Sequence, residues 1–376
     1  MNYLETQTLY IFIYLITTFF AYVSQRKVHG RVCFRPFPLF LSFLIHWFFL
    51  SFTNIGADYY HYEYSIVNAT LSSILEHEEI GFNIISHFFY VISNSSDIAI
   101  FFVKTIEICI LYYGFYRIRY RCDLWLAVFA FNSLVYLQSF LLLSMTLGIV
   151  TIFLSFIILL EGFYIKSFII FLLSCTFHNS CLLLFPTYLL CLFLNANNKR
   201  ISVKYLITFV IIVIIIFMNF ETIFEFALGQ IPAFEHYAQY NLISKYEGSG
   251  LAQIIYFLPL FYFAFILYYS SFNNSIKNIS VIFTCSAFIY AMLGYKLEVL
   301  ARINMNFLGL YSVLIPIVLF SQRNCTIYFK RRLPYTINYL FWITVMIIRS
   351  YYIFKTNMNL DSETDIYCYE FFNPFK

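Results

Sequence analysis

The chain has 376 residues, of which 61% are hydrophobic and 11% are charged, and its formal net charge is only +4. So apolar a composition excludes a water-soluble globular domain and predicts a polytopic membrane protein. Hydrocarbon offers no partners to backbone amides, so runs of about 17 to 25 apolar residues predict helices, and these runs lack the alternation of barrel strands. The expected fold class is an all-α polytopic integral membrane protein, with a single transmembrane helix-bundle domain over residues 1–376.

In chain order, about twelve apolar runs predict membrane-spanning helices. They cover residues 8–24, 37–53, 98–116, 124–141, 142–160, 167–179, 181–195, 203–219, 251–270, 280–295, 303–320 and 335–350. The first run, TLYIFIYLITTFFAYVS, lacks a preceding basic region and a small-residue cleavage site, so we expect a retained helix rather than a cleaved signal.

Lysines and arginines gather in alternate loops between these runs, and by the positive-inside rule those loops are predicted to face the cytoplasm. The clustered residues, sixteen of the 23 in the chain, are Arg26, Lys27, Arg31, Arg35, Arg117, Arg119, Arg121, Lys166, Lys199, Arg200, Lys204, Lys277, Arg323, Lys330, Arg331 and Arg332. The loops near 54–80 and 220–250 instead hold nine acidic residues and one basic residue, Lys245. These two loops and both termini are therefore predicted to lie outside.

One apolar segment, IGFNIISHFFYVIS at residues 80–93, does not fit this alternation. It is shorter than the roughly 20 residues that a spanning helix needs. Counting it as a crossing would also move Arg117, Arg119 and Arg121 to the outer face. We therefore predict a short re-entrant or interfacial helix near 80–93 that covers the mouth of the bundle. The alternative is a short crossing helix in a chain that breaks the charge rule.

Ionisable residues inside apolar runs are candidates for function, because each costs roughly 2.5 to 3.5 kcal/mol on insertion scales. Lys104 and Glu107 lie three residues apart on one predicted helix, and the simplest interpretation is a self-neutralising pair. The nine cysteines show neither CxxC spacing nor clustering with histidine. No disulfide framework, metal site or cofactor is therefore expected.

The stretch NIGADYYHYEYS, residues 54–65, places Asp58 among several tyrosines immediately after an apolar run. The first interpretation is an aromatic belt at the membrane interface, where tyrosine is enriched. The second is a glycan-handling loop, since flat aromatic faces hold sugar rings and a carboxylate accepts hydrogen bonds from their hydroxyls.

Four further candidates lie near the predicted outer face. His178, in SCTFHNSCLLLFP, is either a hydrogen-bonded packing residue or a proton acceptor near neutral pH. Arg302 comes directly before the helix predicted at 303–320, where the helix dipole favours anions and a guanidinium suits phosphate. Lys296, in the loop before this helix, either extends its ammonium group to the membrane surface or assists Arg302. Arg349, near the outer end of the last helix, is a second candidate for phosphate binding.

Taken together, these segments resemble a known family. GADYYHY followed by EIGFNIIS is similar to the G-x-D-Y-x-x-Y and E-x-G-F elements of the EpsG-like branch of the Wzy-type O-antigen and exopolysaccharide polymerases. FHNSCLLLFP resembles the family's H-x-S segment, and ARINMNFLGLYSVLIP resembles its arginine-bearing late helix. The matching positions are Gly56, Asp58, Tyr59, Tyr62, Glu79, Gly81, Phe82, His178, Ser180 and Arg302.

The chain departs from the family pattern at two places. SFTN stands where related sequences carry an arginine before the first motif. LLLSMTLG, with Ser144 and Met145, stands where they carry an arginine–glutamine pair. If those arginines bind phosphate in the family, this chain depends on Arg302, Lys296 or Arg349 instead.

The resemblance implies a metal-independent membrane glycosyltransferase of the O-antigen polymerase type, in the bacterial inner membrane with its active side periplasmic. Such an enzyme transfers an undecaprenyl-pyrophosphate-linked glycan onto the next lipid-linked oligosaccharide repeat unit, in lipopolysaccharide or other surface polysaccharide biosynthesis. The implied partners are these lipid-linked substrates, membrane lipids and a separate chain-length regulator protein, with no nucleic acid.

The resemblance also implies roles for the matching residues. The catalytic residues are expected to be Asp58, His178 and Arg302, with Asp58 or His178 as the base or hydroxyl-orienting group and Arg302 on the pyrophosphate. Substrate binding is assigned to the motif positions Gly56, Tyr59, Tyr62 and Glu79. Lys296 and Arg349, which match no motif position, are added to them because they lie near the predicted outer face.

Other functions are compatible with a chain of this span count. A lipid-linked oligosaccharide flippase would show related halves and charged residues near the midplane, whereas here the polar residues gather at the outer ends. A membrane O-acetyltransferase would carry paired histidine and arginine in its first helix region, and TLYIFIYLITTFF lacks them. A non-catalytic membrane assembly protein is the remaining alternative.

Overall fold

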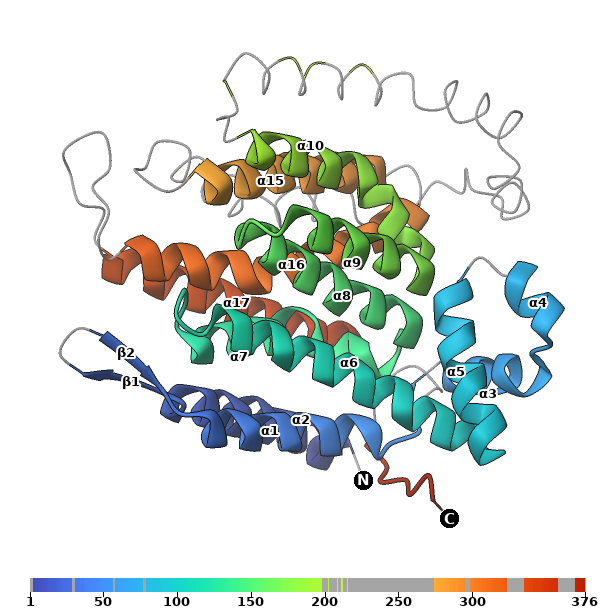
Figure 1. Cartoon of the computed structure of the whole chain (residues 1–376). Coiled ribbons are helices and arrows are strands. Elements are labelled where there is room, and N and C mark those ends of the chain that lie inside the picture. Colours follow the sequence, from blue (N-terminus) through green and yellow to red (C-terminus); the bar gives the residue numbers. More distant parts are fainter. Residues whose placement is uncertain are drawn as a thin grey trace. The chain divides into compact units, whose positions relative to one another are not determined.

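The computed structural model describes residues 3–28, 31–56, 58–76, 79–197, 274–294, 298–322, 335–357 and 369–375, together with positions 202, 208, 211 and 215. Helices dominate this part of the chain, and its only strands form one short antiparallel hairpin (Figure 1). The elements are α1 (Tyr3–Val23), β1 (Gln25–Val28), β2 (Arg31–Phe34), α2 (Pro36–Ser51), α3 (Tyr59–Asn68), α4 (Leu71–Glu76), α5 (Ile80–Ser93), α6 (Ser96–Ile118), α7 (Leu124–Leu134), η1 (Tyr136–Phe140), α8 (Leu143–Leu160), α9 (Tyr164–Phe177), η2 (Asn179–Leu184), α10 (Phe185–Ala196), α15 (Asn274–Gly294), α16 (Glu298–Gln322) and α17 (Tyr335–Asn357).

The fold class agrees with a nearly all-α membrane protein. Four described helices are long and apolar enough to cross a membrane, and they cover Leu4–Val23, Ser96–Ile118, Leu143–Leu160 and Asn179–Ala196. Six shorter apolar helices accompany them. The span predicted at 251–270 and the loop near 220–250 fall outside the described residues, and of the span predicted at 203–219 only positions 208, 211 and 215 are described. The total of twelve spans therefore stays a prediction.

The chain divides into two compact units, which we describe separately. The first comprises Met1–Leu182, Leu308–Cys325 and Arg332–Lys376, and the second comprises Leu183–Phe307 and Thr326–Arg331. Within the second unit α10 packs on α15, where the Thr187 hydroxyl donates a hydrogen bond to Ser286 Oγ. The remaining description concerns the first unit.

Helix α8 is the centre of the first unit. Every residue of α8 is buried except Leu160, and α6 and α9 pack beside it. A Cβ on Gly114 of α6 would lie 2.3 Å from the Phe153 ring, so α6 approaches α8 closely at this glycine. Ser155 and Ser167 exchange hydrogen bonds between α8 and α9, which satisfies these hydroxyls inside an apolar bundle.

Helices α2 and α6 run antiparallel. The Ser42 and Tyr112 hydroxyls meet near the start of α2 and the end of α6, while Lys104 Nζ contacts the Thr53 carbonyl oxygen just beyond α2. The intervening residues 54–95, with α3, α4 and α5, therefore leave and return at the same end of this helix pair. We call this end, with residues 52–97 and η1, the site end.

Helix α5 has the bounds predicted for the short apolar helix at 80–93. Asn94 ends it in the left-handed conformation, with φ of 53°, and the chain then reverses into α6. The Phe89 and Phe102 rings stack across this turn with centroids 4.4 Å apart. At 14 residues, α5 is one of the shorter apolar helices and not one of the four that are long enough to cross a membrane.

Two predicted helices end earlier than the apolar pattern indicated. The helix predicted at 124–141 is wrong in its second part, since α7 stops at Leu134 and η1 follows as a 3₁₀ turn. The helix predicted at 167–179 ends at Phe177 because His178 is extended, with φ of −155° and ψ of 132°. These two breaks put polar side chains at the site end.

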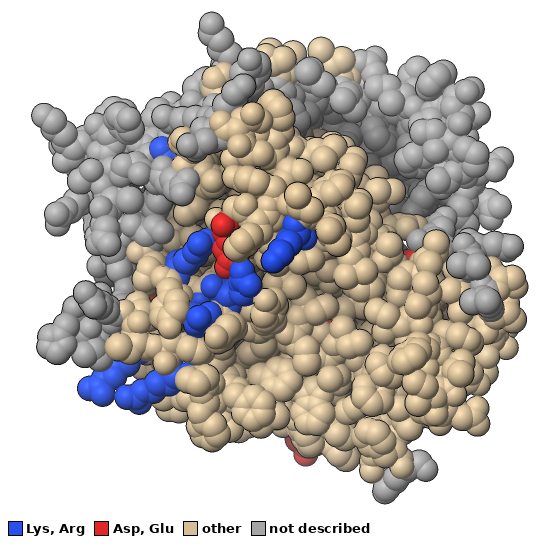
Figure 2. Space-filling view, in the orientation of Figure 1, with Lys and Arg blue, Asp and Glu red and all other residues tan. Residues whose placement is uncertain are grey.

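The opposite end, which we call the hairpin end, carries β1, β2 and residues 117–123 and 160–166. Arg117 forms an ion pair with Glu161, Lys166 lies over the Phe163 ring, and the Arg119 guanidinium lies 3.9 Å from the Tyr116 ring centroid. Figure 2 shows basic side chains gathered around a single acidic one on this face. The first three basic clusters of the sequence thus lie together, as the alternation of charged loops predicted.

The segment 369–375 packs against the site end. The Tyr369 amide donates a hydrogen bond to Thr6 Oγ1, and the Phe372 amide donates to the Phe52 carbonyl oxygen. The Phe371 ring stacks on the Phe52 ring with an interplanar angle of 4°. This C-terminal segment therefore lies beside the start of α1 and the end of α2 (Figure 1).

Candidate functional site

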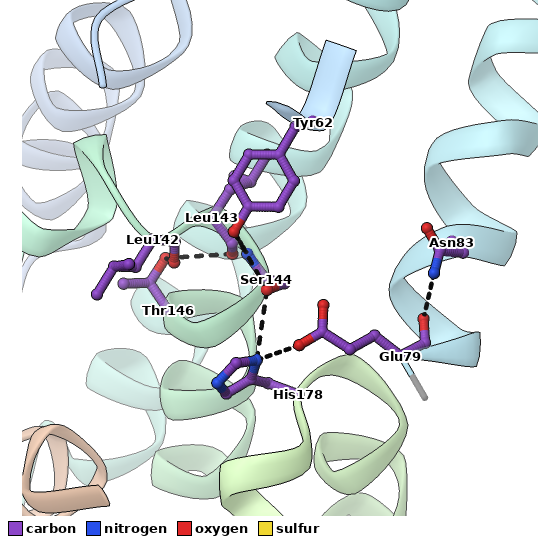
Figure 3. A network of polar contacts seen from close by, with 8 residues as sticks. All are labelled: Tyr62, Glu79, Asn83, Leu142, Leu143, Ser144, Thr146 and His178. Carbon is purple, nitrogen blue, oxygen red and sulfur yellow. Dashed lines mark hydrogen bonds and ion pairs between the residues drawn. The ribbon is translucent and has the colours of Figure 1, made fainter. Parts of the chain in front are cut away.

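Four polar side chains from separate segments meet at the site end (Figure 3). Tyr62 comes from α3, Glu79 from the residue before α5, Ser144 from the first turn of α8, and His178 from the residue after α9. Three of these belong to motifs identified in the sequence. The motifs, far apart along the chain, therefore build one site.

His178 and Glu79 form its centre. The Nδ1 atom of His178 makes a short hydrogen bond with Glu79 Oε1, and the two side chains are 25% and 18% exposed. An ionised carboxylate only accepts hydrogen bonds, so Nδ1 is the donor to Glu79, and in the neutral imidazole the lone pair is then on Nε2. Nε2 points away from Glu79 and Ser144 in Figure 3 and has no hydrogen-bond partner among the described residues.

Hydroxyl groups surround this pair. Ser144 Oγ lies 3.4 Å from His178 Nδ1 and 3.3 Å from the Tyr62 hydroxyl oxygen. Burial is the main cause that raises the pKa of Tyr62 to about 12, and contacts with Ser144 oppose it. Tyr62 is therefore a neutral phenol at physiological pH, able to donate a hydrogen bond.

Asp58 is the other candidate base, and its surroundings differ. It is half-buried at the N-cap of α3, yet its carboxylate makes no capping hydrogen bond and has no hydrogen-bond partner in the described part of the chain. It lies close enough to Tyr62 to act on it electrostatically. Asp58 therefore lies near the Tyr62 side of the network, outside its hydrogen bonds.

Tyr59 lies where the sequence did not place it. Its side chain is only 6% exposed, and its hydroxyl donates a hydrogen bond to Asp97 Oδ1. Burial first, and then this hydrogen bond, raise the pKa of Tyr59 above its usual value. Tyr60 and Tyr64 are instead 72% and 71% exposed. The structure thus makes Tyr59 an internal support and leaves Tyr60 and Tyr64 as the accessible aromatic faces.

The two motif glycines permit close contacts. Gly56 has φ of +138°, and a Cβ there would lie 2.2 Å from the Phe140 carbonyl oxygen. A Cβ on Gly81 would lie 2.2 Å from Thr176 Oγ1. Gly81 thus lets the start of α5 approach the end of α9, which brings Glu79 to His178. The expected substrate-binding role of Gly56 has a simpler account, since only glycine fits this backbone contact.

Of the predicted phosphate-binding residues, only Arg349 has a side chain that the structure describes. Arg302 lies in α16, but its side chain falls outside the described residues, and Lys296 does so entirely. Arg349 is half-buried on α17. Their assignment to pyrophosphate therefore stays a prediction.

Sequence reasoning missed Ser144 as a site residue. The sequence marked this position only as a departure from the family pattern, because LLLSMTLG stands where related sequences have an arginine and a glutamine. The structure puts its hydroxyl between His178 and Tyr62 (Figure 3). The described residues contain no group of three or more His, Cys, Asp or Glu side chains able to hold a metal ion.

An oriented imidazole beside a free carboxylate and several hydroxyls can remove a proton from a substrate hydroxyl. A family model, that of the EpsG family, matches residues 36–369, which include every residue of this site. The chain belongs to the EpsG family. Membership indicates a polysaccharide polymerase-type membrane protein, as the motifs predicted. No curated protein and no solved structure matches the chain.

The EpsG assignment gives the motif residues a structural explanation. In the E-x-G-F element, Glu79 binds His178, Gly81 contacts Thr176, and the Phe82 ring packs 5.3 Å from the Tyr62 ring. In the G-x-D-Y-x-x-Y element, Tyr62 reaches Ser144 while Asp58 stays free. The EpsG motifs thus hold one another in place, while His178 Nε2 and the Asp58 carboxylate have no hydrogen-bond partner in the described part of the chain.

Proposed function

We propose that this protein is a polymerase that transfers an undecaprenyl-pyrophosphate-linked glycan onto the next lipid-linked repeat unit, on the periplasmic side of the inner membrane. The observation that carries the proposal is the Glu79–His178 pair, built by EpsG-family motifs and presenting an unoccupied Nε2. The site end holds the acidic loop near 54–80, which supports an outer location by the charge rule.

The reaction needs a nucleophile, a leaving group and a path for one proton. The acceptor hydroxyl oxygen forms a bond to the anomeric carbon of the donor glycan, and the bond from that carbon to the pyrophosphate oxygen breaks. His178 Nε2 takes the hydroxyl proton, and Glu79 stabilises the resulting imidazolium through Nδ1. The undecaprenyl pyrophosphate leaves with the electron pair.

The remaining groups orient the sugars. Asp58 accepts a hydrogen bond from an acceptor hydroxyl next to the one that reacts, and the Tyr62 phenol donates one to a sugar oxygen. Tyr60 and Tyr64 offer exposed faces to pyranose rings, in the role first expected of Tyr59. Helix α5 covers this end as a re-entrant or interfacial element, as its short length favours.

The leaving pyrophosphate carries charge that needs a cation. Arg302, helped by Lys296, is the proposed partner, since a guanidinium binds phosphate in bidentate fashion and keeps its charge. Arg349 is the second candidate. We propose no metal for this step, because arginine supplies the charge compensation.

Deleting the gene tests the function. The polymerase should be required only to join repeat units to one another. The deletion strain should therefore display single repeat units on its surface glycolipid, without a ladder of longer chains. Loss of all repeat units, single ones included, would instead identify a flippase. A full ladder in the deletion strain would contradict both assignments.

A further inference from the structure

Helix α6 buries two opposite charges inside the first unit. Lys104 is 2% exposed and Glu107 is fully buried. Removing charged groups from water costs several kcal/mol each, roughly, so such a pair is weak support for stability by itself. The two groups act on each other electrostatically, as the predicted self-neutralising pair requires, although no ion-pair contact joins these two described side chains. Each makes its hydrogen bond with a different segment.

Lys104 holds the loop that carries Asp58. Its ammonium group donates a 2.7 Å hydrogen bond to the carbonyl oxygen of Thr53, where this loop begins. The same group lies 5.6 Å from the ring centroid of Tyr59, where the loop ends. One lysine thus contacts both ends of residues 53–59. Asp97, two turns earlier on α6, adds a third contact by accepting the Tyr59 hydroxyl hydrogen bond.

Glu107 holds the segment that carries Ser144. Its Oε2 atom accepts a 3.1 Å hydrogen bond from the Thr146 hydroxyl in α8, two residues after Ser144. The Ser139 hydroxyl, in η1, lies near this carboxyl group without a hydrogen bond between them. The turn between η1 and α8 is therefore held from α6 through Thr146.

We propose that Lys104 and Glu107 are positioning residues that fix the two walls of the EpsG site, Lys104 through residues 53–59 and Glu107 through residues 139–146. The inference rests on the proposed polymerase function. Each wall joins the end of one element to the start of the next, residues 53–59 between α2 and α3 and residues 139–146 between η1 and α8. A side-chain hydrogen bond holds each of them to a rigid helix, one donated by Lys104 to Thr53 and one accepted by Glu107 from Thr146.

Hydrogen-exchange mass spectrometry on the purified full chain, with chain extension measured per folded molecule, separates positioning from general destabilisation. Lys104→Met should increase exchange at least about tenfold at the hydrogen-bonded amides of Ile55, Tyr59 and Tyr62, and leave residues 139–146 unchanged. Glu107→Gln should increase exchange within residues 139–146 and leave the amides of Ile55, Tyr59 and Tyr62 unchanged. Each should slow extension at least about tenfold, since small displacements of reacting groups cost rate steeply.

The matched control is Glu161→Gln, which removes a carboxylate from the Arg117 ion pair at the hairpin end and should leave extension and both walls unchanged. If Lys104→Met does not fold, Lys104→Gln keeps a neutral donor and should show the same pattern at smaller amplitude. Exchange that rises evenly through the first unit, or extension within twofold of wild type, overturns the positioning role. A wild-type protein that fails to extend chains refutes the polymerase function instead, whatever the exchange pattern.

Discussion

Replacing Glu79 with glutamine tests the orientation of the His178 ring without changing the size of the side chain. The substitution removes one charge-assisted hydrogen bond, which contributes about 1.5 to 3 kcal/mol. Both partners are partly exposed, at 18% and 25%, so water weakens the interaction toward the lower end of that range. About 1.5 to 2 kcal/mol in the transition state corresponds to a rate of chain extension about 10 to 30 times slower.

His178→Ala should cost more, because it removes the proposed base itself. General base catalysis contributes about 10²- to 10⁴-fold to a rate. Glu79 acts only through the His178 ring, so adding Glu79→Gln to His178→Ala should slow the reaction no further. The two substitutions should therefore be strongly non-additive.

The assay measures elongation of lipid-linked repeat units in membranes that contain equal amounts of each variant. Glu161→Gln serves as the control for loss of a carboxylate. If Glu79→Gln slows the His178→Ala protein by the same factor as the wild type, the two residues act independently and the orienting role is refuted. If His178→Ala extends chains at near wild-type rate, Asp58 becomes the base.

Three further predictions address other parts of the chain. Gly56→Ala should destabilise the protein by about 2 to 6 kcal/mol, from about 1 to 3 of backbone strain and about 1 to 3 of overpacking. Gly162→Ala should lose only the stability that corresponds to backbone strain, because φ there is +88° and no atom lies within 4 Å of an added Cβ. Equal shifts in melting temperature for the two variants would contradict this account. Arg302→Ala should abolish chain extension while expression persists, and an unchanged ladder would remove Arg302 from the mechanism. Reporter fusions at residues 70 and 120 should report opposite sides of the membrane, whereas a same-side result would make α5 a crossing helix.

Much of the helical framework could be predicted because apolar length decides it. The segment 80–93 stood out by being short, and the structure gives it those bounds. The break after Leu134 could not be predicted, because the following residues Val135–Phe140 are mostly apolar and contain neither glycine nor proline. There the close approach of Gly56 to the Phe140 carbonyl, a contact between distant segments, accompanies the break.

The site was predicted as a set of residues but not as an arrangement. The Glu79–His178 contact joins positions 99 residues apart, and no spacing within one helix or turn carries that information. The place of Tyr59 was predictable in principle. On a helix, Tyr59 and Tyr62 share one face while Tyr60 and Tyr64 share another, and the structure buries the first face and exposes the second.

The C-terminal segment has a practical consequence for labelling experiments. Phe371 and Phe375 pack on Phe52, the residue immediately before the loop that Lys104 holds. A fluorescent protein or affinity tag fused directly after Lys376 would pull on these rings and on the wall that bears Asp58. The β1–β2 hairpin is the safer attachment site, because it follows the 21 residues of α1, a length of about 30 Å, at the other end of the bundle.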